Sequence, residues 1–474
     1  MLPPSGFRTA NEALFGGRFG LMSGPVPDGQ KTRIRRRDGR KTQIVVVGGG
    51  AGGLELITKL GKALGRKDFD IILVDRNQTH IWKPLLHEVA AGSLDANLDE
   101  VGYRGHAYRW GYRYFDGALE DIDRDAGEIV VAPILDDNGR EIVGRHRIRF
   151  DYLVLAVGSV SNDFGTPGVR EHAMSLETRA DADRFRRRLL NQCLRVSREM
   201  SANPDAESFA RVAIVGGGAT GVELSAELYS AAAGLAFYGL EVFDGERLKV
   251  TLIEAGPRIL PALPEKLAAA AHHELGVLGV DVLTGTPVVS VSAEAIQLKD
   301  GRAIPADIMV WAAGVKGPEF LQGIGGLETT AGNQIVVGQT LQTTRDARIF
   351  AIGDCARFVP AEGGRPVPPR AQAAHQMATT AYRNIRASID GKPLEKFEYK
   401  DHGSLVNLAR FTTVGSLMGN LVGGSMAVEG RLARLVYASL YRMHLVAIHG
   451  WWKGASLVLV GHVNQVVRPK LKLH

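Results

Sequence analysis

One nine-residue sequence occurs twice in the chain with little change: GGGAGGLEL begins at Gly48, and GGGATGVEL begins 168 residues later, at Gly216. Each copy follows a short apolar, β-branched run and leads into a helical pattern. A strand, a glycine-rich turn and a helix in this order predict a βαβ unit that binds a dinucleotide. The duplication therefore predicts two modules of the same kind in an α/β protein.

The first copy contains the three fingerprint glycines Gly48, Gly50 and Gly53, followed by a predicted helix that ends at Leu64. The first glycine allows a tight turn, the second lets a pyrophosphate approach the backbone, and the third lets the helix pack closely. The helix N-terminus adds partial positive charge. Asp75 ends the next apolar run, and we expect it to accept hydrogen bonds from the hydroxyls of an adenosine ribose.

The second copy repeats the pattern with Gly216, Gly218 and Gly221, and its acid is Glu254. A carboxylate at this place repels a 2′-phosphate, which favours NADH over NADPH. The nearest following basic residue is Arg258. Two dinucleotide sites in one chain imply two different dinucleotides, and the obvious chemistry is hydride transfer from a nicotinamide to a flavin.

Composition excludes several other classes of protein. With 474 residues, 45% of them hydrophobic and 23% charged, the chain is long enough for two or three domains and is not disordered throughout. Its two cysteines, Cys193 and Cys355, form no CxxC or zinc-ligand spacing and no disulfide framework, so we expect no metal site. We expect both thiols to be structural. No apolar run reaches the roughly 18 residues of a spanning helix.

The charge is unevenly distributed along the chain. The net charge is +6, yet residues 431–474 contain seven Lys and Arg and no acid, and residues 1–42 are also basic. The part between is acidic, which does not suit a nucleic-acid partner. Basic ends suit an anionic membrane surface better. We expect residues 1–41 to be a disordered basic extension.

The C-terminal tail combines three features of membrane-interface helices. Apolar residues recur at helical spacing between residues 432 and 447, two tryptophans follow at Trp451 and Trp452, and basic residues flank them. The pattern predicts amphipathic membrane-anchoring helices within residues 391–474. A helix that packs against a domain or forms a dimer is the alternative, although it explains the absence of acids less well.

Further motifs give the chain a family resemblance. Two later apolar runs end at Gly158 and Gly314, and a third ends in Gly353-Asp354, as in flavoproteins with two dinucleotide-binding domains. More narrowly, residues 82–92 (WKPLLHEVAAG), 371–376 (AQAAHQ) and 440–451 resemble type II NADH:quinone oxidoreductases. The resemblance covers residues 42 to 474.

The resemblance implies a domain plan and a reaction. FAD is expected in a domain made of residues 42–160 and 335–390, with Asp354 at its ribityl chain, and NADH in an inserted domain at 165–330. NADH reduces FAD, and two electrons then pass to a membrane quinone without proton pumping. The resemblance also implies a peripheral protein on the cytoplasmic face of a bacterial inner membrane, and it makes a homodimer possible.

By the same resemblance, Glu223 projects towards the flavin and the nicotinamide. Quinone reduction consumes two protons, so a carboxyl there can relay one. The alternative is that Glu223 only complements its helix dipole, since Glu55 occupies the equivalent position of the first module. Lys83 is expected to contact FAD, and His87 and His375 to lie near the redox site.

Gln372 and Gln376 share one face of a helix predicted over residues 370–384. The resemblance places this segment beside the isoalloxazine ring and the quinone headgroup. Backbone N–H groups near Ala373 are expected to stabilise negative charge on the flavin. A polar face that only contacts solvent is the alternative for the two glutamines.

Two other functions stay open from the sequence. A soluble NADH:acceptor reductase of the ferredoxin-linked type uses the same two sites, and a redox-sensing module binds both cofactors without rapid turnover. Disulfide reductases are disfavoured because no cysteine precedes Cys193. Sulfide:quinone oxidoreductases also need active cysteines, and they lack an intact second fingerprint.

Overall fold

The computed structural model describes residues 40–94, 100–203, 205–235, 245–361, 363–408, 412–419, 424–429, 444–450 and 454. Two predicted regions lie mostly outside the described residues. Only residues 40 and 41 of the predicted N-terminal extension are described, and only residues 444–450 and 454 of the tail from residue 431. Within the described residues, no helix is both long and apolar enough to span a membrane.

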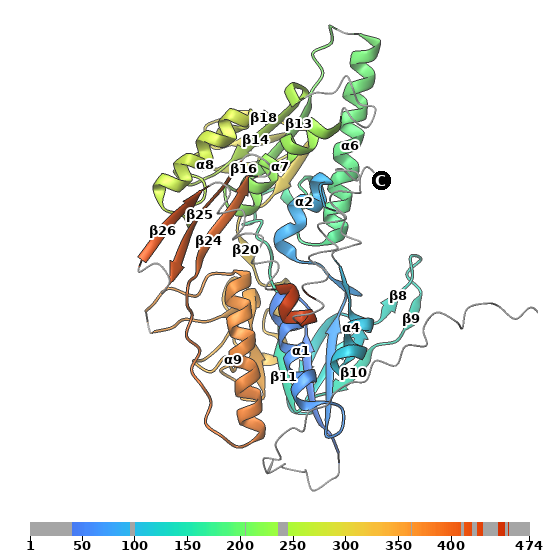
Figure 1. The fold of residues 1–474 in the computed structure, drawn as a ribbon. Helices are drawn as coiled ribbons and strands as arrows, with labels where there is room; N and C mark the ends of the chain where they lie inside the picture. The colour runs from blue at the N-terminus through green and yellow to red at the C-terminus, as the bar shows by residue number, and fades with distance from the viewer. Residues whose placement is uncertain are drawn as a thin grey trace, which may run out of the picture. The chain divides into compact units, whose positions relative to one another are not determined.

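The first dinucleotide module is built on a five-stranded parallel sheet in the order β22-β11-β1-β2-β5. Helix α1 (Ala51–Leu64) connects β1 to β2, so the predicted βαβ unit is present (Figure 1). The helix begins at Ala51, so the last two glycines of the motif, Gly52 and Gly53, lie in its first turn. The strands are β1 (Thr42–Val47), β2 (Phe69–Asp75), β5 (Arg113–Asp116), β11 (Tyr152–Leu155) and β22 (Ile349–Ala351).

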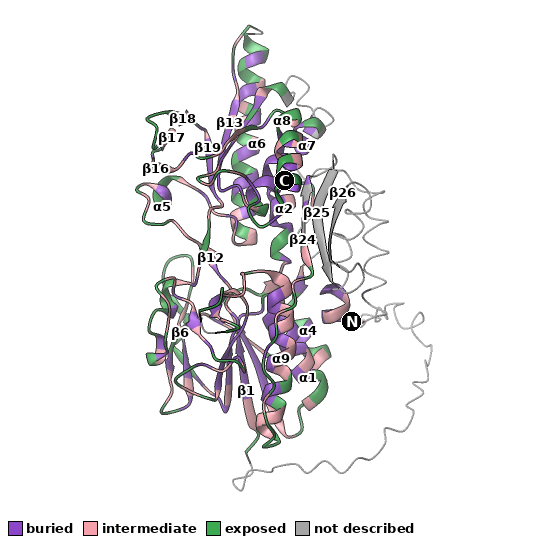
Figure 2. Ribbon diagram, turned by 90° about the vertical axis from the view of Figure 1, so that its left-hand side faces the viewer, coloured by how far each residue is buried: buried purple, intermediate pink, exposed green. Residues whose placement is uncertain are grey.

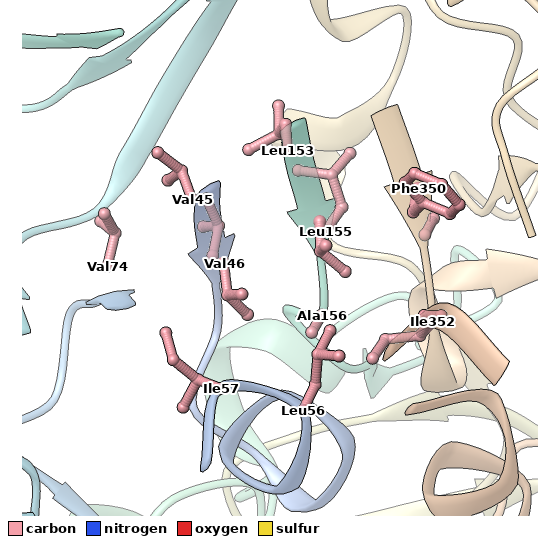
Figure 3. Packing of buried hydrophobic residues seen from close by; sticks show 14 of the residues in the cluster. Val45, Val46, Leu56, Ile57, Val74, Leu153, Leu155, Ala156, Phe350 and Ile352 are labelled. Atoms are coloured by element: carbon pink, nitrogen blue, oxygen red, sulfur yellow. The ribbon is translucent and has the colours of Figure 1, made fainter. Parts of the chain in front are cut away.

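The core of this module explains why its central strands are continuously apolar. Val45 and Val46 of β1 point to opposite faces of the sheet, and both are fully buried. Leu56 and Ile57 of α1 pack below the strands, and Phe350 of β22 lies at the far side (Figure 3). A strand covered on both faces needs this pattern.

The second module repeats the arrangement with a four-stranded parallel sheet in the order β15-β14-β13-β19. Helix α7 (Ala219–Leu235) follows β13, as α1 follows β1, and α8 (Glu265–Leu278) precedes β15. The strands are β13 (Ala210–Val215), β14 (Leu248–Ile253), β15 (Asp281–Leu283) and β19 (Ile308–Trp311). The predicted α/β class with two Rossmann-like units is confirmed.

Each parallel sheet is accompanied by a small antiparallel one. β10-β7-β6 accompanies the first and β16-β17-β18 the second. Their strands are β6 (Leu119–Asp123), β7 (Glu128–Val131), β10 (His146–Arg149), β16 (Val288–Val291), β17 (Ala295–Leu298) and β18 (Ala303–Pro305). The long helix α6 (Arg179–Ala202) starts with a capping box, in which the Thr178 hydroxyl accepts the Asp181 N–H and the Asp181 carboxylate accepts the Thr178 N–H.

Two short strands join the modules as a ribbon. β12 (Val160–Ser161) leaves the first module, and β20 (Val315–Lys316) returns from the second. They pair antiparallel, with Val160 opposite Lys316. Because both connections run through this one ribbon, the second module is an insertion in the first.

Helix α9 (Ala371–Ile389) packs against α1, and a three-stranded antiparallel sheet follows it. That sheet consists of β24 (Gly403–Leu408), β25 (Thr412–Gly419) and β26 (Gly424–Glu429). β24 packs against α7 of the second module. Figure 2 shows the buried faces of α1 and α9 turned towards each other.

The remaining elements are short and mostly connect the larger ones. They are β3 (Thr79–His80), η1 (Lys83–Leu85), α2 (Leu86–Ala91), β4 (Val101–Gly102), α4 (Tyr103–Trp110), β8 (Ile134–Leu135), β9 (Glu141–Val143), α5 (Val169–His172), η3 (Gly245–Arg247), η4 (Glu319–Leu321), η5 (Ile324–Gly326), β21 (Ile335–Val336), η6 (Gly353–Cys355) and β23 (Ala356–Arg357).

Candidate functional site: two dinucleotide cradles

The first glycine turn has the three steric properties that its sequence predicts. Gly48 adopts φ +99°, and a Cβ there would lie 2.4 Å from the Ala156 carbonyl oxygen. A Cβ on Gly53 would lie 1.9 Å from the carbonyl oxygen of Gly48. Around Gly50, by contrast, a Cβ would meet nothing within 4 Å. Two positions require glycine because of the fold, and the third leaves open space where a pyrophosphate can approach.

The second turn has the same three properties. Gly216 adopts φ +115°, and a Cβ there would lie 2.7 Å from the Ala312 carbonyl carbon. A Cβ on Gly221 would lie 2.0 Å from the carbonyl oxygen of Gly216, and one on Gly218 would meet nothing within 4 Å. We call each glycine turn, together with the acid that ends the following strand, a cradle. Both cradles have room for the pyrophosphate of a dinucleotide.

The acid that ends each second strand contacts the glycine turn. Asp75 accepts the Gly49 N–H at 2.6 Å, and Glu254 accepts the Gly217 N–H at 2.7 Å. Burial raises the pKa of Asp75, and hydrogen bonds from the Gly49 and Asn77 backbone oppose that rise. Both carboxylates lie at the carboxyl ends of their strands, the expected place for a ribose acceptor.

Gly158 and Gly314 lie where the chain leaves each parallel sheet. Their φ angles are +73° and +61°, a region that favours glycine. The carbonyl oxygen of Gly314 accepts the Asn162 N–H at 3.3 Å, next to the ribbon between the modules. The two glycines thus occupy equivalent places, as the sequence predicts.

Asp354 and Lys83 approach the first module from different segments and share Ser159 as a neighbour. The half-buried Asp354 carboxylate accepts the Ser159 hydroxyl at 2.8 Å, and removal from solvent raises the pKa of this acid. Lys83 donates to the Ser159 carbonyl oxygen at 3.2 Å and forms an ion pair with Glu177. Ser159 and Glu177 were not predicted from the sequence. Only Ser159 could have been found there, because it directly follows Gly158.

The two glutamines of α9 lie on one face, and both hold the segment that leads into β24. The Gln372 side chain donates to Gly403 at 3.0 Å and accepts the His402 N–H at 3.1 Å. Gln376 makes a pair of hydrogen bonds with the backbone of Lys400, at 2.8 and 2.9 Å. Their amide groups therefore position residues 400–403. These hydrogen bonds could not be predicted from the sequence.

Ala373 is buried where α9 meets the start of α1. A Cβ on Gly52 would lie 3.0 Å from the Ala374 carbonyl oxygen, so the helices approach closely here. The N–H groups of Ala373 and Ala374 both donate to the Arg370 carbonyl oxygen, at 3.0 and 3.1 Å. Both donors thus bond to the residue that precedes the helix, and their expected role in stabilising flavin charge stays a prediction.

Glu223 faces His87 across the boundary between α7 and α2. His87 Nδ1 lies 3.6 Å from a Glu223 carboxylate oxygen, and both side chains are buried. Burial lowers the pKa of His87 to about 4, so its imidazole is neutral at physiological pH. A buried carboxyl beside a neutral imidazole can hold or pass a proton.

A group of aromatic and histidine side chains lies beside α1 and was not foreseen. His80 Nε2 lies 2.9 Å from His444 Nε2, and the Trp82 ring lies 4.1 Å from that of His444. Trp82 also stacks on His375, which is hydrogen-bonded to Glu55. These residues come from four separate segments, so no local pattern links them.

Both cysteines are buried, as expected for structural thiols. Burial raises the pKa of Cys193 and of Cys355 to about 12. Thiols with such pKa values stay protonated and are poor nucleophiles. Among the described residues, no group of three or more His, Cys, Asp or Glu side chains could hold a metal ion.

The family model for pyridine nucleotide-disulphide oxidoreductases matches residues 42–378. A type II NADH:quinone oxidoreductase from Haemophilus influenzae is 46% identical over 442 residues, which are 91% of this chain and 99% of the relative. The chain belongs to the type II NADH:quinone oxidoreductase family. A Staphylococcus aureus member of this family is 30% identical over 82% of this chain and 92% of its own length.

Solved structures support the fold of this type II family member. NDH2 from Plasmodium falciparum, solved in complex with NADH, superposes with a TM-score of 0.75 at 19% identity and covers 91% of this chain and 100% of its own. A sulfide:quinone oxidoreductase from Aquifex aeolicus gives 0.65 at 17% identity, over 90% of this chain and 95% of its own.

Proposed function

We propose that this chain is an FAD-dependent NADH:quinone oxidoreductase. The observation that carries the proposal is the repeated cradle: two turns with the same glycine sterics and the same acid contact occur in one chain. One dinucleotide can act as the reductant and the other as the resident cofactor. Family membership selects a quinone as the acceptor.

The first cradle is assigned to FAD and the second to NADH. In the turn formed by Gly48, Gly50 and Gly53, the open space at Gly50 would admit the FAD pyrophosphate, and Asp75 would accept from its ribose. Asp354, half-buried and hydrogen-bonded to Ser159, is assigned to the ribityl chain. FAD held there would supply the redox chemistry that links NADH oxidation to quinone reduction.

Glu254 selects the nucleotide in the second cradle. Its two oxygens accept the N–H groups of Gly217 and Gly256, at 2.7 and 2.6 Å, which fixes the carboxylate at the strand end. A 2′-phosphate there would meet a fixed negative charge. The second cradle therefore prefers NADH over NADPH.

Glu223 serves the proton side of quinone reduction. It is buried beside the neutral imidazole of His87, so a carboxyl at this place can give a proton during quinone reduction and take one up again before the next turnover. Gln372 and Gln376 act by holding residues 400–403 against α9. Both glutamines are thus positioning residues in this proposal.

The proposed setting is a peripheral one, with residues 391–474 attaching the enzyme to the cytoplasmic face of a bacterial inner membrane. The acid-free sequence of residues 431–474 supports this assignment. Assembly as a homodimer belongs to the same proposal. Electron transfer is not coupled to proton pumping, and proton uptake into vesicles reconstituted with this chain alone would contradict that.

Anaerobic mixing of the lipid-supplemented holoenzyme with NADH, followed by a short-chain quinone, tests the function. We expect NADH to bleach the flavin absorbance, quinone to restore it, and NADPH to bleach it far more slowly. Bleaching without recovery would favour a protein acceptor of the ferredoxin type. Slow bleaching would favour a redox-sensing module.

The role of Glu223 is tested with Glu223→Gln and a matched control. Glu227→Gln lies one turn further along α7 and is equally buried. We expect Glu223→Gln to slow the quinone step about tenfold or more and to alter its pH profile, whereas Glu227→Gln leaves both nearly unchanged. Equal effects from the two variants would show that Glu223 is only structural.

A further inference from the structure

Helix α4 carries a basic and aromatic surface that the dinucleotide cradles do not use. Its exposed side chains are Arg104, Tyr108 and Arg109, and Tyr108 is 82% exposed. A tyrosine this exposed leaves most of its apolar ring in water. Such a ring between two arginines is typical of a surface that receives a partner.

The end of α1 extends this positive surface. Lys62 Nζ lies 6.0 Å from the centre of the Trp110 ring, and Arg66 donates to a carbonyl oxygen of α4 at 3.2 Å. Residues 59–67 contain four Lys or Arg and no acid, and residues 101–113 contain three arginines and no acid. We call the following five side chains the α4 surface: Lys62, Arg66, Arg104, Tyr108 and Arg109.

The same helix holds part of the C-terminal tail. His106 Nε2 lies 2.9 Å from the Ile448 carbonyl oxygen, and Arg109 donates to the His449 carbonyl oxygen at 3.4 Å. Ile448 is fully buried in the core of the first module. The α4 surface is therefore continuous with residues 444–449, which belong to the acid-free stretch.

We propose that the α4 surface docks on anionic phospholipid headgroups and is a second membrane contact besides the tail. Lys and Arg near an anionic bilayer are attracted to it, and tyrosine rings favour the headgroup level. The proposal deepens the proposed membrane attachment and rests on it. Because α4 belongs to the first module, directly before β5 in sequence, and packs on α1, this contact would hold the FAD cradle itself close to the bilayer.

Sedimentation of the full-length holoenzyme with vesicles of phosphatidylcholine, with and without phosphatidylglycerol, tests the proposal. The test variant is Arg104→Glu/Arg109→Glu. Its matched control, Arg187→Glu/Arg188→Glu, changes the net charge equally at two exposed arginines of α6. We expect the test variant to bind anionic vesicles about tenfold more weakly, and the control to stay within about twofold of the wild type.

Two further variants test whether weaker vesicle binding could result from a change in the fold. Arg109 contacts His449, so Lys62→Glu/Arg104→Glu repeats the charge reversal without touching that contact. Tyr108→Ser removes an exposed ring, and we expect binding about threefold weaker. Oxidation of NADH by ferricyanide, a water-soluble acceptor, should stay unchanged in all four variants.

Three results would overturn the proposal. Wild-type binding by the α4 variants would show that the tail acts alone. An equal loss of vesicle binding in the Arg187/Arg188 control would show that only the net charge of the protein matters. Equal binding of the wild type to neutral and anionic vesicles would exclude recognition of anionic headgroups. None of these results touches the proposed NADH:quinone activity, which the flavin measurements test separately.

Discussion

The imidazole of His375 is hydrogen-bonded to the carboxylate of Glu55, a residue 320 positions away in the sequence. Glu55 also accepts from Lys59 at 2.5 Å, and Lys59 reaches the Thr379 hydroxyl at 2.7 Å. This network ties the middle of α1 to the N-terminal half of α9. Glu55 thus serves tertiary contact and is more than a complement to its own helix dipole.

The first prediction concerns this pair. Burial favours the neutral form of Glu55, but the hydrogen bonds and charges of His375 and Lys59 outweigh burial and lower the pKa of the carboxyl. A lowered pKa stabilises the fold above the ordinary value of about 4.5, and that contribution is lost as the pH falls below it. Glu55→Gln should therefore destabilise the protein at pH 7 by about 1–3 kcal/mol, and by less at pH 4.

Urea unfolding at the two pH values measures this difference. A double-mutant cycle with His375→Asn should give a coupling free energy of at least about 0.5 kcal/mol at pH 7. Additive effects of the two substitutions would mean that the pair contributes nothing.

The second prediction separates two glycines of one turn. Gly50→Ala meets no neighbour within 4 Å, so the protein should fold but bind FAD at least about tenfold more weakly, because the methyl group occupies the pyrophosphate approach. Gly53→Ala places a Cβ 1.9 Å from the Gly48 carbonyl oxygen and should destabilise the fold itself. Circular dichroism melting and flavin content after purification distinguish the two. Normal flavin content in Gly50→Ala would count against the assignment of the first cradle.

The third prediction concerns coenzyme choice. Glu254→Ala removes the fixed negative charge at the end of β14 and should raise the kcat/KM for NADPH relative to NADH by about tenfold. The substitution also frees the Gly217 and Gly256 N–H groups, so NADH binding should weaken. Steady-state kinetics with both coenzymes measure the ratio. An unchanged ratio would mean that selectivity lies elsewhere.

The fourth prediction is a loss of stability in mild acid. Burial lowers the pKa of His80 to about 4 from an ordinary value of 6.5, because a charged imidazole cannot be solvated there. The neutral His80 therefore makes its full contribution to the stability of the fold above about pH 6.5. That contribution is lost as the pH falls towards 4. For this residue alone the loss at pH 5 is about 2 kcal/mol.

His80→Gln removes this titration and should flatten the stability profile between pH 7 and pH 5. The absolute stability of the variant at pH 7 is not the test, since the contact with His444 is lost there too. A wild-type profile that stays flat over this range would show that His80 is solvated or charged in the folded protein.

The tertiary structure decided every contact between distant segments. His80, Trp82, His375 and His444 come together from three segments, with Glu55 from a fourth, and Lys83 pairs with Glu177. Gln372 and Gln376 hold residues 400–403, although their spacing alone left a solvent-facing role open. Such pairs depend on how α1, α9 and the second module pack, and packing responds to shape and burial over the whole chain.

Both dinucleotide modules can be predicted from the sequence alone. The requirements at Gly48, Gly53, Gly216 and Gly221 arise from steric contacts within one turn and the strand beside it, so they appear as a local pattern. Asp75 and Glu254 are likewise placed by the ends of their own strands. Steric requirements within one turn produce a recognisable pattern of adjacent residues. The packing that brings His375 to Glu55 involves distant segments and produces no such local pattern.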